Sequence, residues 1–295
     1  MRVIVTGASG FLGKELVKRL DECKIDFVAA TTRPSVLIEE IGIAANSVVM
    51  ANQLLCENFY RSDDIIMNCA FPRTNDGLAM AAGLNYLAEL INCAIKGNVG
   101  GFMNISSQSV YSQHRTKPAV ETDALCLESS YAVAKRGVEL LLEAQAELMP
   151  YTNIRLASLI GPSFDQRVPN RVAKRAWETG QIQVADNGSE YGFMDVRDAA
   201  SALMEMLSSV NTWQKTYNLS SEQCWTLLDI AEDVKRILET TSGKTIEIDY
   251  TKTQTEPVNT LVDSSLFWGS FDWRPIYDRY NSMQAIVASV VGKQG

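Results

Sequence analysis

Paired cysteines, histidine and long apolar runs are scarce in this sequence. The six cysteines lie singly, with no Cys-x-x-Cys pair, which argues against a metal site and a disulfide framework and fits reduced thiols in a cytoplasm. The one histidine, His114, lies in an expected loop, where a lone histidine is ordinarily solvated. No segment approaches the roughly 18 apolar residues of a membrane span. The first expected strand begins at residue 2 and leaves no room for a signal peptide. These absences predict a cytoplasmic protein that binds neither a metal nor a membrane.

Positive charge is also in deficit. The chain has 27 lysines and arginines against 35 aspartates and glutamates, a net charge of −8, and a pI of about 4.9. This balance argues against a nucleic-acid partner. It leaves anionic small substrates open, because a few local arginines are enough to hold a phosphate. With 46% hydrophobic and 21% charged residues in 295, the composition is that of a globular protein of one large or two small domains.

A glycine loop near the start of the chain is the densest motif. The β-branched strand at Val3–Thr6 runs into the spacing Gly7-x-x-Gly10-x-x-Gly13, and leucines at every fourth position then mark a helix. Backbone N–H groups and the positive end of the helix dipole meet at such a loop and suit a pyrophosphate. Gly7 permits the tight turn, Gly10 the approach of the phosphates, and Gly13 close packing of helix on strand. The pattern predicts dinucleotide binding.

Strands and helices alternate through the first half of the chain, which is typical of a doubly wound parallel sheet. We predict an α/β fold with a Rossmann-type doubly wound parallel sheet and a smaller C-terminal lobe that binds the substrate. The sheet domain spans residues 1–160, with 190–220 returning to it, and the lobe spans 161–189 and 221–295. The expected strands are Val3–Thr6, Phe27–Thr31, Ser47–Met50, Asp64–Cys69, Gly101–Ser106, Asn153–Leu159, Gln181–Val184, Tyr191–Val196 and Thr216–Leu219. The expected helices are Gly77–Ile95, Ser130–Ala146, Val168–Thr179, Asp198–Leu207 and Leu227–Leu238.

A tyrosine and a lysine stand one helical turn apart in the segment Tyr131-Ala-Val-Ala-Lys135. A tyrosine is a poor acid or base near neutral pH, but a fixed cation close to the phenol favours its ionised form. Ser107 lies 24 residues before Tyr131, at the end of an expected strand. A hydroxyl at that edge can polarise a carbonyl oxygen beside the tyrosine. The three residues are candidate catalytic groups.

These motifs resemble the extended short-chain dehydrogenases/reductases, in their branch of nucleotide-sugar epimerases and dehydratases. The resemblance implies that Ser107 is the catalytic hydroxyl, that Tyr131 and Lys135 act with it, and that Asn85 braces the surroundings of Lys135. It covers nearly the whole chain. The matching segments are Thr6–Gly13, Ser106–Tyr111, Tyr131–Lys135, the helix residue Asn85, Arg155–Pro162, Tyr191–Asp198 and Asp272–Pro275.

Departures from the family pattern reduce the number of reactions that we expect of this chain. Relatives that eliminate water carry Thr-Asp-Glu where this chain has Ser107-Gln108-Ser109, so a dehydratase is not expected. Relatives that invert a carbon beside the ketone need a cysteine and a histidine, and the cysteine position is Gln108 here. The arginine that usually opens the family segment at Tyr191–Asp198 is missing, so other arginines must contact the substrate. The candidate substrate-binding residues are Arg73, Gln108, Arg167, Arg171 and Arg274.

The end of the second strand favours NADP(H) over NAD. An NAD-selective fold places a carboxylate there, whereas this chain reads Ala29-Ala30-Thr31-Thr32-Arg33. Arg33 can pair with a 2′-phosphate, helped by the hydroxyls of Thr32 and Ser9. Asn52 is the candidate for the adenine amine, and Cys69 with Ala70 is expected to pass the central riboses. The full set of expected cofactor contacts is Gly7, Ser9, Gly10, Phe11, Leu12, Gly13, Thr32, Arg33, Asn52, Cys69, Ala70, Lys135 and Leu159.

The resemblance and the departures together predict an NADP-dependent reductase of a keto group, namely the 4-keto group of a nucleotide-linked deoxysugar. Three alternatives stay open. The first is a 4-epimerase that oxidises its substrate transiently with a tightly held cofactor. The second reduces an apolar ketone or aldehyde, and the third is a dinucleotide sensor without catalysis. The family also implies a homodimer through the helices Gly77–Ile95 and Ser130–Ala146.

Overall fold

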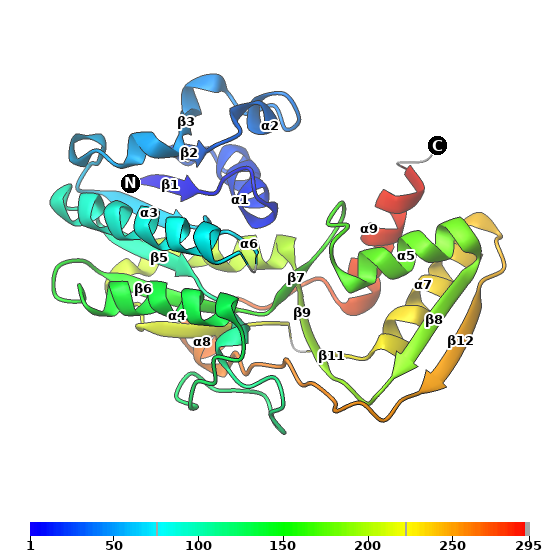
Figure 1. Ribbon diagram of the computed structural model, residues 1–295. Helices are drawn as coiled ribbons and strands as arrows, with labels where there is room; N and C mark the ends of the chain where they lie inside the picture. Colours follow the sequence, from blue (N-terminus) through cyan, green and yellow to red (C-terminus); the bar gives the residue numbers. More distant parts are fainter. Residues whose placement is uncertain (75, 222, 293–295) are drawn as a thin grey trace.

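A seven-stranded sheet forms the larger part of the molecule (Figure 1). The computed structural model describes residues 1–74, 76–221 and 223–292. Every pairing in this sheet is parallel, and the strand order is β3-β2-β1-β4-β5-β6-β10. The order reverses between β1 and β4, where sheets of this class bind dinucleotides beyond the carboxyl ends of the strands. The predicted Rossmann-type sheet is confirmed. Its strands are β1 (Arg2–Thr6), β2 (Phe27–Thr31), β3 (Val48–Met50), β4 (Asp64–Asn68), β5 (Gly101–Ile105), β6 (Tyr151–Leu156) and β10 (Thr216–Leu219).

Helices cover both faces of this sheet. Alternate residues of β1 point to opposite faces, so Val3 and Val5 join one core cluster while Ile4 joins another. Helices α1 and α6 pack over the first cluster, and α3 and α4 pack side by side over the second. Burial on both faces explains why the strands are continuous apolar runs. The helices of this part are α1 (Phe11–Glu22), α2 (Pro34–Ile38), α3 (Gly77–Lys96), α4 (Ser130–Glu143) and α6 (Val196–Glu205).

The smaller lobe lies beyond the carboxyl ends of the large sheet, on the right of Figure 1. A two-stranded parallel sheet of β8 and β12 and three mutually packed helices enclose a separate apolar core. A three-stranded sheet, β11-β9-β7, lies between this lobe and the large sheet. The elements are β7 (Ser158–Ile160), α5 (Val168–Thr179), β8 (Gln181–Asp186), β9 (Tyr191–Asp195), β11 (Cys224–Trp225), α7 (Leu227–Ser242), β12 (Glu247–Lys252) and α9 (Arg279–Gly292).

The expected strand Asn153–Leu159 is two strands in different sheets. β6 ends at Leu156 in the large sheet, whereas β7 begins at Ser158 and pairs with β9. Ala157 lies at the change of sheet, and its N–H donates to the carbonyl oxygen of Leu219 at 2.9 Å. A continuous apolar run does not reveal such a change, because the run is the same whichever sheet buries it.

The predicted boundary of the C-terminal lobe also needs correction. Helix α8 (Ser265–Ser270) packs on the large sheet, and the rings of Phe267 and Phe271 lie 5.7 and 5.5 Å from that of Tyr217. Residues 265–273 therefore belong with the large sheet, so the segment 221–295 is not one continuous part of the lobe. The physical reason is a late cluster of aromatic side chains, which gain most from burial in the larger core.

Helix α3 is more apolar than the sequence analysis stated. An 18-residue window within it has a mean hydropathy of 1.4, so one described helix is long and apolar enough to cross a membrane by length and composition. Only 28% of that window is buried, on the side that faces the sheet. The neighbouring α4 also exposes apolar side chains at Val133 and Leu140. The homodimer expected through these two helices stays a prediction.

Candidate active site

The glycine loop between β1 and α1 lets an anion approach the backbone. Gly7 has a φ of 63°, and a Cβ there would stand 2.8 Å from the backbone of Ala70. A Cβ at Gly10 would meet the Gly7 carbonyl oxygen at 3.0 Å, and Gly13 packs against the same turn. Helix α1 begins at Phe11, and its first turn holds no acidic side chain. N–H groups of a first helical turn lack intrahelical partners, so the loop fits the pyrophosphate of a dinucleotide.

A cleft of about 400 Å³ continues from this loop to the end of β2. Thr31 Oγ1 donates to Ser9 Oγ at 2.7 Å and accepts from the backbone N–H of Arg33 at 3.0 Å. Arg33 Nη2 lies 3.5 Å from the carbonyl oxygen of Ser9. No aspartate or glutamate is among the described residues that line this cleft. The exposed guanidinium and the hydroxyl groups suit a phosphate on the adenine-side ribose.

Helix α4 carries the tyrosine and the lysine of the Tyr-x-x-x-Lys motif. Its start is fixed by Ser129, whose hydroxyl accepts from the N–H of Ala132 at 3.1 Å. Lys135 is buried, and its Nζ donates to the carbonyl oxygen of Ile105 at 2.6 Å. The same Nζ lies 5.8 Å from the centre of the Tyr131 ring. The end of β5 therefore anchors a cation beside the phenol, in a cleft of about 520 Å³ that both side chains line.

Ser107 lines the same cleft, at the end of β5. Its Oγ accepts from the N–H of Ser109 at 3.2 Å and from the hydroxyl of Ser109 at 2.9 Å. A serine hydroxyl has two acceptor positions and one proton. Because both acceptor positions are used, the proton of Ser107 is the part left to interact with a ligand.

Gln108 follows Ser107 and is buried in the wall of the cleft. Its Oε1 accepts from Arg115 Nη2 at 2.9 Å, and its Nε2 donates to Gln113 Oε1 at 3.4 Å. An amide held in this way neither gains nor loses a proton at neutral pH. The position therefore supplies no acid or base to a reaction in the cleft.

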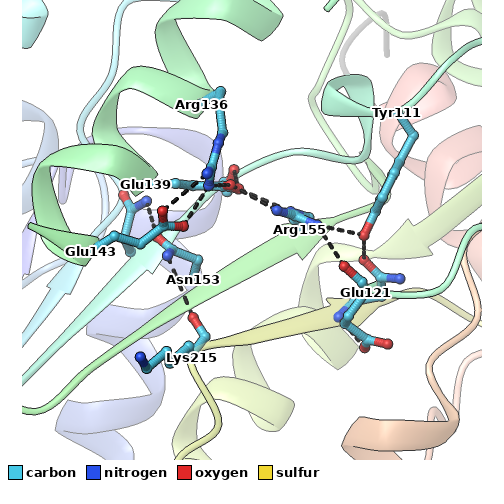
Figure 2. Close-up of polar contacts among 11 residues, drawn as sticks. Tyr111, Glu121, Arg136, Glu139, Glu143, Asn153, Arg155 and Lys215 are labelled. Atoms are coloured by element: carbon cyan, nitrogen blue, oxygen red, sulfur yellow. Dashed lines mark hydrogen bonds and ion pairs between the residues drawn. The ribbon is translucent and has the colours of Figure 1, made fainter. Parts of the chain in front are cut away.

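A buried ion-pair network behind the cleft was not identified from the sequence (Figure 2). Glu139 is fully buried and accepts from Ser106 Oγ at 2.5 Å and from Arg155 Nε and Nη2 at 3.1 and 2.9 Å. Arg155 Nη1 in turn donates to the hydroxyl of Tyr111 at 2.8 Å. Figure 2 shows Arg155 between Glu139 and Tyr111. The network ties Ser106, at the strand end next to Ser107, to helix α4.

One signal in the sequence points to Glu139. Tyr131, Lys135 and Glu139 recur at every fourth residue, and this spacing places the three side chains on one face of a helix. A carboxylate in line with two catalytic candidates faces the same strand end as they do. Its partner Arg155 lies on β6 and has no such local signal.

The structure brings most of the predicted site residues to the two clefts. The exceptions among the described residues are Asn52, Asn85, Arg171 and Arg274, which line neither cleft, and Gly13, which packs beneath the loop. The predicted residues that line a cleft are Gly7, Ser9, Gly10, Phe11, Leu12, Thr32, Arg33, Cys69, Ala70, Arg73, Ser107, Gln108, Tyr131, Lys135, Leu159 and Arg167.

The four exceptions other than Gly13 also have structural reasons. Asn85 is exposed on the side of α3 opposite its buried residues, so the predicted bracing of Lys135 is not made by its side chain. Asn52 is exposed beside Ala51, and Ala51 forms the cleft wall. Arg274 donates to two tryptophan carbonyl groups, and Arg171 is exposed on α5.

Cys69 and His114 were given no catalytic part by the sequence analysis. Burial raises the pKa of the Cys69 thiol to about 12, against the opposing effect of Lys135, so the group stays a protonated packing residue at neutral pH. His114 is exposed, outside both clefts, and its Nδ1 lies 3.2 Å from the carbonyl oxygen of Pro257. In the part of the chain that the structure describes, no group of three or more His, Cys, Asp or Glu side chains is placed to hold a metal.

The phosphate loop on a Rossmann-type sheet, joined to the cleft of Ser107, Tyr131 and Lys135, defines a dinucleotide-dependent enzyme of the oxidoreductase type. The chain belongs to the NAD dependent epimerase/dehydratase family, whose sequence profile matches residues 3–220. The predicted kinship with the extended short-chain dehydrogenases/reductases is therefore confirmed.

Similar proteins span several activities. The chain is 23% identical to Protein CapI of Staphylococcus aureus over 81% of its own length and 84% of that protein. It is 26% identical to dTDP-4-dehydro-6-deoxy-D-allose reductase of a Streptomyces species, over 80% of this chain and 81% of that protein. The solved UDP-glucuronic acid 4-epimerase of Bacillus cereus, in complex with UDP-glucuronic acid and NAD, superposes with a TM-score of 0.82 at 19% identity, over 99% of this chain and 100% of that one. Such distant likeness establishes the fold and not the substrate.

Proposed function

We propose that this protein is an NADP-dependent reductase of the 4-keto group of a nucleotide-linked sugar. The observation that carries the proposal is the composition of one cleft. It combines the hydroxyl groups of Ser107 and Tyr131 and the ammonium of Lys135 with an amide at Gln108, where a water-eliminating enzyme needs an acid. Such a cleft can move one proton to or from a carbonyl oxygen. The amide of Gln108 cannot perform the second proton transfer that elimination of water requires. A dTDP-keto-sugar reductase among the relatives supports the same reaction.

Each side chain has a distinct part in the proposed reaction. A bound NADPH supplies the hydride. Ser107 donates a hydrogen bond to the carbonyl oxygen of the substrate, because its acceptor positions are already occupied by Ser109. Tyr131 donates the proton to the same oxygen. Lys135, anchored on Ile105, favours the phenolate that results by its nearby charge.

Arg33 is proposed to select NADPH over NADH. Replacing Arg33 with alanine is expected to weaken NADPH binding about 10-fold or more, because a charge-assisted hydrogen bond is lost, and to leave NADH binding nearly unchanged. Titration of tryptophan fluorescence with each cofactor measures both constants. Arg61→Ala is a matched control, since Arg61 is an exposed arginine paired with Asp26 outside the cleft. Equal affinities of the unmodified protein for the two cofactors would contradict the assignment.

A 4-epimerase is the second candidate function. Epimerisation at C4 through a keto intermediate needs the same serine, tyrosine and lysine, and no further acid or base, because the intermediate only rotates in the cleft. Several solved structures with similar folds are 4-epimerases. A tightly held cofactor that is regenerated in every cycle is the property that separates this candidate from a reductase.

Cofactor turnover distinguishes the two candidates. The purified protein is incubated with UDP-, dTDP-, CDP- and GDP-linked sugars and their 4-keto derivatives, while absorbance at 340 nm reports NADPH and NMR reports the products. A reductase consumes one NADPH for each keto sugar reduced and is purified largely without cofactor. Interconversion of two sugars without net NADPH consumption, by protein that retains its cofactor, would overturn the reductase proposal in favour of the epimerase.

A further inference from the structure

The catalytic cleft has an excess of positive charge. Three cationic side chains line it, those of Arg73, Lys135 and Arg167, and no aspartate or glutamate is among the described residues that do so. Lys135 is held by a backbone carbonyl and stands beside the phenol of Tyr131. The two arginines have no part in the reaction as proposed above. Arg167 is half-buried, and a half-buried charge ordinarily meets a counter-charge, so Arg167 with its neighbour Arg73 points to an anionic group on the ligand.

Arg167 gives this inference its sharpest feature. Its Nε is buried and makes no hydrogen bond to any described residue. Burial and, to a smaller extent, the charge of Arg73 lower the pKa of its guanidinium to about 10, and the phenol of Tyr131 opposes the shift. The guanidinium is therefore close enough to Arg73 and Tyr131 for their charges to act on it. An anion in the cleft would accept a hydrogen bond from Arg167 Nε and would reduce the repulsion between the two guanidinium groups.

An aromatic side chain holds the two guanidinium groups together. Phe164, on the loop before α5, stacks on Phe11 at 4.1 Å between ring centres with an angle of 15° between the rings. The guanidinium carbons of Arg167 and Arg73 lie 5.5 and 5.7 Å from the centre of the Phe164 ring. Both guanidinium groups therefore lie near the same ring, in the cleft that Tyr131 and Lys135 also line.

We propose that Arg73 and Arg167 bind a carboxylate on the sugar ring, so that the substrate is a nucleotide-linked uronic acid. The inference rests on the proposed function, because it takes the carbonyl at Tyr131 to be C4 of the sugar. C5 is bonded directly to C4, so a group on C5 would lie in the cleft that Tyr131, Arg73 and Arg167 line together. A deoxysugar, expected from the sequence, would place a methyl group there if C6 is the carbon without oxygen, and would leave the half-buried Arg167 without a counter-charge. A carboxylate accepts from both arginines in a charge-assisted geometry.

Paired ligands that differ only at C6 test the proposal. Binding of UDP-glucuronic acid and of UDP-glucose is measured by calorimetry with NADP⁺ present, in the Tyr131→Phe background so that no turnover disturbs the titration. The same pair is repeated with dTDP in place of UDP, and each nucleoside diphosphate is titrated alone. The acid is expected to bind at least about 10-fold more tightly than the neutral sugar, because two charge-assisted hydrogen bonds form only with the acid.

Neutral arginine variants assign the preference to this pair. Arg167→Gln and Arg73→Gln are each expected to remove most of the preference for the acid and to leave the affinity for UDP-glucose nearly unchanged. Arg73 is exposed, so its replacement does not endanger folding, and thermal melting checks Arg167→Gln. Arg175→Gln is the matched control, because Arg175 is an exposed arginine of α5 whose guanidinium contacts Gln183. That variant should keep the full preference.

Two outcomes overturn the inference while the proposed function stands. One is an equal or tighter affinity for the neutral sugars. The other is an equal loss of affinity for the acid, the neutral sugar and the free nucleoside diphosphate in the arginine variants, which would assign the pair to the diphosphate. Failure of these ligands and of the matching CDP- and GDP-linked sugars to bind would contradict the proposed function itself, and the uronic acid with it.

Discussion

Replacing Tyr131 with phenylalanine is expected to lower turnover about 100-fold or more and to leave cofactor binding nearly unchanged. The substitution removes the phenolic proton that faces the cleft beside Lys135 and keeps the ring. That ring packs edge to face on Phe71, with 6.3 Å between the ring centres, and the contact needs no hydroxyl group. The fold and the cofactor site should therefore survive, and the loss should fall on the chemical step.

Single-turnover kinetics with a 4-keto sugar nucleotide measure this step directly, and cofactor titration measures binding. Tyr250→Phe is the control, because Tyr250 is an exposed tyrosine of β12 whose hydroxyl donates to Asp186 far along the chain. It should turn over at the rate of the unmodified protein. A rate for Tyr131→Phe within about threefold of that of the unmodified protein would remove the tyrosine from the mechanism, since loss of a general acid costs about 100-fold or more.

The large sheet was predictable because its signals are local. The glycine loop fixes the start of α1 and the crossover from β1, and the short apolar runs of β2, β4 and β5 are too brief for helices. Helix α5 was predicted with the bounds that the structure has, Val168–Thr179, because a proline opens it and Gly180 in a left-handed conformation ends it. The break at Ala157 and the return of α8 to the large sheet depend on tertiary partners. No local pattern records these.

In the candidate site, too, residues with a local sequence signal were predictable and residues brought together by tertiary contacts were not. Ser107, Tyr131 and Lys135 were found because their spacing is fixed by one strand end and one helix. Arg73 and Arg167 were only members of a list of arginines, since their closeness depends on the stacking of Phe164 on Phe11 across two loops. Asn85 was predicted to lie near Lys135 from a family motif of which only the asparagine matches this chain. Helical periodicity, counted from the buried residues of α3, would have put it on the outer side.

The pairing of Glu139 with Arg155 is the second feature with a large expected effect. Both side chains are buried, Arg155 binds both carboxylate oxygen atoms, and Ser106 and Arg136 donate to the same carboxylate. Removal of Glu139 leaves the buried Arg155 without its ion-pair partner in a medium of low dielectric constant, whereas removal of Arg155 leaves Glu139 paired with Arg136 alone. The strand end next to Ser107 loses its anchor at the same time.

Glu139→Leu is expected to lower the free energy of unfolding by about 3 to 5 kcal/mol, because it leaves the buried Arg155 without its counter-charge. Arg155→Met is expected to cost less, because Arg136 still pairs with Glu139. The double variant should recover much of this loss, since it buries two apolar side chains in place of the pair. Urea unfolding at pH 7, followed by tryptophan fluorescence, measures the three variants against the unmodified protein. Lys174→Met serves as a control, because Lys174 is exposed and its ion pair with Glu178 lies on the surface. Additive losses in the double variant would show that the two residues do not act as a pair.

Acid adds an independent test of the same pair. Burial raises the pKa of Glu139, but the hydrogen bonds and charge of Arg155 outweigh it, so the pKa in the folded protein lies below the ordinary value of 4.5. A carboxyl group of this kind contributes stability that is fully present above its unfolded pKa and is lost as the pH falls through its folded pKa. The unmodified protein should therefore lose stability below about pH 4.5, and Glu139→Gln should lose less over the same range. Parallel stability–pH curves for the two proteins would contradict an ionised Glu139 in the folded state, because a charged buried carboxylate requires the curves to converge as it is protonated.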